Sequence, residues 1–151
     1  MEQKFDFPTE VIELPSKGLL YPEENPLSSG KIEMKYMTAK EEDILTNQSY
    51  IQKGVVLDKL LQALIVSKIN YNDLIIGDKN AIMVAARILG YGKDYQFKYT
   101  NDRGQEVEAT IDLSTLKEKE LDKSLFKKGI NEFTYALPKS GNVVTFKLLT
   151  H

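Results

Sequence analysis

The chain has 151 residues, 42% of them hydrophobic and 28% charged, and its 20 basic side chains nearly balance its 22 acidic ones. This length and composition fit one globular domain, and the near-neutral charge argues against unaided nucleic-acid binding. The sequence has no Cys and one His, His151, so disulfides, thiolate zinc sites, thiol catalysis and His clusters for a metal are excluded. Most enzyme classes are thereby excluded, and we expect no metal or other cofactor.

The N-terminal part is rich in proline, with four of the five prolines at Pro8, Pro15, Pro22 and Pro26. Residues 11–14 fit one short strand. Proline fixes φ and lacks an amide donor, so the rest of this arm cannot lie inside a central strand of a sheet. We expect residues 1–30 to form a strand and a proline-rich arm that wraps over a surface, followed by an α+β domain over 31–151.

The central part alternates at first and then takes a helical period, which predicts a strand over 31–37 and helices over 38–45, 55–68 and 79–89. Thr38 with Glu41 three residues later has the pattern of a capping box. Asp78 is a favourable N-cap for the third helix, which Gly90 or Gly92 would end. The apolar stripe of the second helix is typical of an amphipathic helix.

Beyond Gly92 the pattern predicts two β-hairpins, 95–99 with 107–111 and 132–137 with 143–149, separated by a charged and weakly helical segment. Tyr95, Phe97 and Tyr99 share one face of the first hairpin, which is more typical of a core layer than of a base-stacking surface. The chain stops directly after a strand with no polar tail, which favours a piece of a longer protein. The fold class is therefore α+β, with an N-terminal β segment, central helices and two C-terminal hairpins.

Acid–base catalysis would need carboxylates that converge in a pocket, and the spacing of the acidic residues shows no such pair. The candidates are Glu41, Glu42, Asp43, Asp73, Asp78 and Asp112. Helix starts explain the first three, and capping explains Asp78. A carboxylate-only Mg²⁺ or Ca²⁺ site stays open, although no calcium-loop spacing is present. We expect no catalytic, metal-binding or cofactor-binding residues.

Several stretches, taken in this order, resemble the T4-type bacteriophage baseplate protein family. They are 13–22 (ELPSKGLLYP), 36–45 (YMTAKEEDIL), 74–80 (LIIGDKN), 85–88 (AARI), 90–92 (GYG), 137–141 (LPKSG) and 146–150 (FKLLT). The chain also looks distantly similar to phage tail assembly chaperones. Some members of that wider group carry paired cysteines like those of a zinc ribbon. The corresponding hairpin tip here, 100–104, has none, so we predict that it binds no zinc.

The resemblance implies a non-enzymatic tail morphogenesis protein that acts in assembly of the contractile-tail baseplate hub, as a structural component or as an assembly chaperone. Its implied partners are other phage baseplate or tail proteins, with no nucleic acid, membrane or small-molecule substrate. The implied location is the host cytoplasm during assembly and, for a structural component, the virion tail baseplate.

Two segments are candidates for protein interaction, the arm through Leu19, Leu20 and Tyr21, and the helix over 55–68 through Leu57 and Leu61. Prolines pre-order the arm, so its docking would lose less conformational entropy than docking of a free chain. The alternative for both is packing within the chain. If the arm docks, Leu20→Asp with Tyr21→Ala should weaken partner binding and leave the fold intact.

A second hypothesis is a tail-associated, carboxylate-based cell-wall hydrolase. Such an enzyme would need a paired acid and nucleophile in a sugar-sized cleft. The sequence favours the assembly protein, because no glutamate stands alone in apolar surroundings that would raise its pKa.

Overall fold

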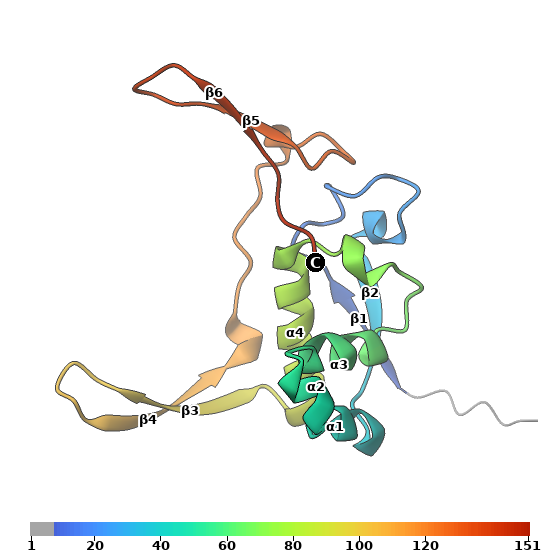
Figure 1. The fold of residues 1–151 in the computed structure, drawn as a ribbon, viewed down its shortest axis with the longest axis vertical. Helices are drawn as coiled ribbons and strands as arrows, with labels where there is room; N and C mark the ends of the chain where they lie inside the picture. Colours follow the sequence, from blue (N-terminus) through green and yellow to red (C-terminus); the bar gives the residue numbers. More distant parts are fainter. Residues whose placement is uncertain (1–7) are drawn as a thin grey trace, which may run out of the picture.

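The computed structural model describes residues 8–151, which form an α+β fold of four α-helices and six strands (Figure 1). The predicted fold class is confirmed. The strands are arranged as three separate antiparallel pairs, β1–β2, β3–β4 and β5–β6. The elements are β1 (Thr9–Glu13), β2 (Lys31–Lys35), α1 (Ala39–Leu45), α2 (Gln48–Gln52), α3 (Val56–Leu64), α4 (Ile76–Tyr91), β3 (Asp94–Thr100), β4 (Glu106–Asp112), β5 (Phe133–Ala136) and β6 (Val143–Phe146).

The β1–β2 pair forms one side of the core. β1 and β2 pair across residue 30, where the sequence suggested a division between arm and domain. Alternation along β2 turns Ile32 and Met34 inward, and both are fully buried. The backbone N–H of Val66 donates to the carbonyl of Glu33 at 2.8 Å, which ties the chain after α3 to the second edge of β2.

α1 begins as the capping box predicts. Glu41 accepts hydrogen bonds from the backbone N–H of Thr38 at 3.1 Å and from Nζ of Lys35 at 2.7 Å, and its side chain is buried. Burial alone would raise the pKa of the Glu41 carboxyl, but the hydrogen bonds from Lys35 and Thr38 lower this pKa to about 2. Glu41 therefore fastens the start of α1 to the end of β2 as a carboxylate.

This pKa predicts acid sensitivity. A carboxyl with a pKa of about 2 in the folded chain and an ordinary value of 4.5 adds about 3 kcal/mol of stability above pH 4.5. That contribution should fall progressively as the pH drops from 4.5 toward 2. Urea unfolding across this range should show a smaller loss of stability on acidification for Glu41→Gln than for the wild type. The same acid slope in both proteins would contradict the assignment.

The helices differ from the prediction at their ends. α3 ends at Leu64, four residues early, because Ile65 is extended and forms a bridge with Met34 of β2. α4 begins at Ile76, so Asp78 lies in its first turn and is not its N-cap. Gly92 ends α4 at φ 81°, as expected for glycine, whereas Gly90 lies inside the helix. α2 was not predicted.

The C-terminal third projects from this body. In Figure 1, β3–β4 leaves the lower end of α4, a long segment runs beside α4, and β5–β6 projects near its upper end. The segment expected to be weakly helical contains only short 3₁₀ turns, Leu113–Thr115 and Lys123–Leu125. The chain then returns to the start of α4, where the N–H of Ile76 donates to the carbonyl of Leu149 at 3.0 Å.

The buried apolar residues all precede the two projecting hairpins. They are Leu14, Leu20, Tyr21, Leu27, Ile32, Met34, Leu60, Leu61, Leu64, Tyr71, Leu74, Ile75, Ile82 and Ala86. Within the described part of the chain, no residue after Ala86 is buried. Only a few later side chains, among them Phe126 and Phe133, pack against the core from outside. The hairpins therefore have no core of their own.

Candidate protein-interaction surfaces

The proline-rich arm is part of the core. Leu20 is 6% exposed and Tyr21 is 3% exposed, so neither is available as an exposed anchor. This burial favours the alternative, packing within the chain, over docking of these two side chains onto a partner. The sequence showed that the arm contains apolar residues, but the surface that they cover was not visible in it.

A buried carboxylate fastens the arm to α4. Asp78 is fully buried and accepts three hydrogen bonds, from the N–H of Ser16 at 3.0 Å, from Oγ of Ser16 at 2.7 Å and from the hydroxyl of Tyr21 at 2.7 Å. The Tyr21 hydroxyl in turn accepts from the N–H of Ile75 at 3.1 Å. Burial, and secondly the bond to Asp78, raise the pKa of the Tyr21 phenol. Tyr21 thus acts as a neutral donor that links the arm, Ile75 and Asp78.

The arm closes on itself where two glycines meet. Gly18 and Gly30 both have a left-handed backbone, with φ of 73° and 71°. A Cβ at Gly18 would lie 2.3 Å from the carbonyl oxygen of Ser28, so no larger residue fits. The N–H of Leu14 donates to the carbonyl of Gly30 at 2.8 Å. Residues 14–30 therefore form a closed loop that is packed as part of the fold.

The remaining predicted anchors divide into two groups. Leu61 is 1% exposed and belongs to the core, so its burial, like that of Leu20, favours packing within the chain. Leu57 is 47% exposed on α3, and Leu19 is half-buried, with its carbonyl accepting from the N–H of Gly129 at 2.8 Å. The interaction role of Leu57 and Leu19 stays a prediction.

A polar cluster that the sequence did not indicate surrounds His151. Asp58 on α3 binds Nζ of Lys79 at 2.6 Å and the hydroxyl of Tyr71 at 2.9 Å, and lies 3.7 Å from Nε2 of His151. Burial alone would raise the pKa of the Asp58 carboxyl, but Lys79 and Tyr71 hold it below its usual value. His151 Nδ1 is 2.9 Å from Lys79 Nζ, and the His151 ring packs edge-on against Tyr71. Because each polar group is engaged by another, the cluster fastens the returning chain to α3 and α4.

The β3–β4 hairpin has one apolar face. The register places Tyr95, Phe97 and Tyr99 of β3 opposite Ile111, Ala109 and Val107 of β4. Adjacent rings lie at centroid distances of 5.9 and 6.0 Å. Tyr95 is 43% exposed and Tyr99 is 47% exposed, so the expected core layer is wrong. The alternation predicted the strands correctly, but the hairpin projects from the body. Arg87 of α4 lies over the Tyr95 ring, 5.6 Å from its centroid, and Tyr95 and Tyr99 stay largely exposed.

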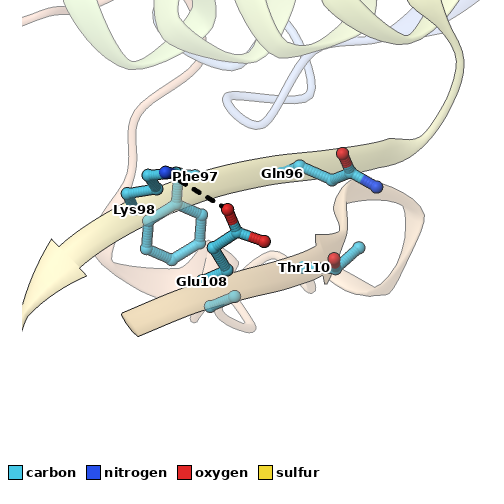
Figure 2. Close-up of a pocket in the computed structure, with 6 residues that line it drawn as sticks. Gln96, Phe97, Lys98, Glu108 and Thr110 are labelled. Carbon is cyan, nitrogen blue, oxygen red and sulfur yellow. Dashed lines mark ion pairs between the residues drawn. The ribbon is translucent and has the colours of Figure 1, made fainter. Parts of the chain in front are cut away.

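The opposite face of β3–β4 is polar. Lys98 forms ion pairs with Glu106 at 3.0 Å and Glu108 at 3.3 Å, and Figure 2 shows the pair with Glu108 across the strands. Gln96 and Thr110 lie opposite each other further along the same face (Figure 2). These side chains line only a shallow hollow, since a two-stranded ribbon offers no further layer to enclose a ligand. The hairpin is therefore amphipathic, with an apolar side that is largely exposed.

The β5–β6 hairpin also exposes an apolar face. Phe133 and Tyr135 lie opposite Phe146 and Val144 on one face. The rings of Phe133 and Phe146 stack at 5.5 Å, and Phe126 packs edge-on against Phe133 at 5.7 Å, next to the core. Further from the core, Tyr135 is 55% exposed. The base of this hairpin is thus anchored and its outer part is uncovered.

Two carboxyl side chains of the described chain, Glu41 and Asp78, are fully buried. Both are engaged by hydrogen-bond donors. Residues 8–151 contain no group of three or more His, Cys, Asp or Glu side chains placed to hold a metal ion. Over the same residues, no helix has the length and apolar character needed to cross a membrane.

Comparison with known proteins gives one match. A family model described as T4 bacteriophage base plate protein matches residues 10–150. No curated protein and no solved structure matches the chain.

Proposed function

Because the chain belongs to the T4 bacteriophage base plate protein family, we propose that it is a non-enzymatic baseplate hub protein, a component or assembly factor, that binds other tail proteins through its projecting hairpins. The observation that carries this proposal is the contrast between the two halves of the chain. The core ends at Ala86, whereas both later hairpins expose an apolar face. Isolated two-stranded hairpins are marginally stable in water, and contiguous exposed apolar patches mark interaction sites. A partner that covers these apolar faces would stabilise both hairpins.

The absence of enzymatic activity is part of the proposal. The two buried carboxylates are held by donors from the arm and from β2, so neither is free to transfer a proton to a substrate. Purified protein should leave a suspension of cell walls turbid. Lysis of the walls by the wild type, abolished by substitution of a carboxylate, would contradict this part of the proposal.

The hairpin role is tested by two adjacent substitutions that add the same charge to opposite faces of β3. Phe97→Asp places a charge on the apolar face, and Gln96→Asp places one on the polar face. In phage that carry these variants, we expect Phe97→Asp to reduce the yield of complete baseplates at least tenfold, since burying an unpaired charge in an interface is costly. Gln96→Asp should assemble normally.

Because β3 lies outside the core, both variants should melt like the wild type. Normal assembly of the Phe97→Asp phage would contradict the proposed role of this face. The two forms of the proposal, component and assembly factor, are separated by the copy number of the protein in purified virions. A fixed copy number identifies a component, and loss after assembly identifies a transient factor.

A further inference from the structure

The apolar faces of the two hairpins are similar in composition. Each presents one apolar face in which aromatic residues of one strand lie opposite aliphatic or aromatic residues of the other, Tyr95 opposite Ile111 and Tyr135 opposite Val144. Faces of this kind pack on one another in β-sandwiches, with the side chains of the two faces interdigitating. The apolar face of each hairpin could therefore cover that of the other.

The two hairpins are also complementary in charge. Residues 93–112, which hold β3–β4, contain five acidic and three basic side chains. Residues 132–147, which hold β5–β6, contain two lysines and a single acidic residue, Glu132. Opposite net charges steer the two surfaces together and disfavour pairing of either hairpin with its own kind.

The two hairpins of one chain are held apart. The segment between them is fixed at two points, by an ion pair of Glu118 with Lys17 at 2.7 Å and by the hydrogen bond from Gly129 to Leu19 at 2.8 Å. Lys128 also donates to the carbonyl of Ser28 at 3.0 Å. Figure 1 shows the hairpins projecting near opposite ends of α4. Contact within one chain would require these anchors to break.

We propose that the β3–β4 hairpin of one copy packs its apolar face against that of the β5–β6 hairpin of a second copy of this chain. This contact is heterologous, since each copy contributes a different surface, so successive copies join head to tail in a ring or an open chain. The proposal deepens the proposed function by naming one partner of the hairpins. It concerns the purified protein alone and is tested separately from baseplate assembly.

Sedimentation velocity of the full chain over a range of concentrations tests the proposal. The wild type should self-associate beyond the dimer and dissociate as salt rises from about 0.05 M to about 0.5 M, because screening weakens the attraction between the hairpins. Phe97→Asp and Tyr135→Lys each place a charge on one apolar face and should weaken self-association about a hundredfold. The matched controls, Gln96→Asp and Thr134→Lys, add the same charges to the opposite faces and should associate like the wild type.

The decisive measurement is a mixture of the two disabled variants. Phe97→Asp keeps an intact β5–β6 face and Tyr135→Lys keeps an intact β3–β4 face, so the mixture should form a one-to-one heterodimer that cannot grow further. Thermal melts confirm that each variant is folded.

Three results would overturn the inference. They are a wild type that stays monomeric up to about 1 mM, self-association lost in only one of the two variants, and a mixture without heterodimer. If these results appear while Phe97→Asp still blocks baseplate assembly in phage, the proposed function stands and self-pairing is wrong.

Discussion

Asp78→Ala should destabilise the fold by about 3–5 kcal/mol, because it leaves three buried donors without an acceptor, and each such donor costs about 1–3 kcal/mol. The donors are the N–H and hydroxyl of Ser16 and the hydroxyl of Tyr21. Since these bonds join the arm to the first turn of α4, the loss should loosen the arm along the whole loop. Hydrogen exchange should therefore show reduced protection between residues 14 and 30.

Urea unfolding of the Asp78→Ala variant measures the loss of stability. Asp43→Ala is the matched control, since Asp43 is an exposed aspartate on a helix, and it should change stability by less than about 0.5 kcal/mol. Similar stabilities for Asp78→Ala and Asp43→Ala would mean that the buried network contributes little net free energy.

The double substitution Leu20→Asp with Tyr21→Ala should unfold the chain. It places a carboxylate at a site that is 6% exposed and removes an aromatic ring that is 3% exposed, together with the hydroxyl that links Ile75 and Asp78. Burial of an unpaired charge and loss of a core ring together cost about as much as the 5–15 kcal/mol that stabilises a typical domain. This result is the opposite of the intact fold expected from the sequence.

Circular dichroism and thermal melting distinguish the two expectations. Leu57→Asp, on the exposed side of α3, is the control and should remain folded. A milder variant, Tyr21→Phe, isolates the hydroxyl and should cost about 1–3 kcal/mol. A double variant that melts like the wild type would show that the arm is not part of the core.

The local patterns of the sequence predicted most of the elements. Alternation identified β2, β3 and β4, and the capping box at Thr38 placed the start of α1 correctly. Errors arose where a tertiary contact overrides a local preference. Asp78 has the local signature of an N-cap, but three donors from the arm, more than 50 residues away in sequence, place it inside α4.

The sequence could not distinguish exposed from buried apolar faces, for a physical reason. An apolar face looks the same in sequence whether a core or only solvent lies against it. Leu20 therefore stayed a candidate for docking, and Tyr95 was expected in a core layer. The difference depends on where the chain turns after α4, and a single sequence carries no local signal for that direction. The mutual engagement of Asp58, Lys79 and His151 was likewise invisible, because it joins three elements.

α4 has a geometric consequence for the two hairpins. Its C-terminal end continues through Gly92 into β3, and its N-terminal end binds the chain that returns from β6, through the bridge of Ile75 with Thr150. A helix of 16 residues is about 24 Å long. The length of α4 thus sets the distance between the bases of the two hairpins. Partners bound to the two hairpins would be held at a fixed separation, and a load applied to one hairpin would pass to the other along the axis of this helix.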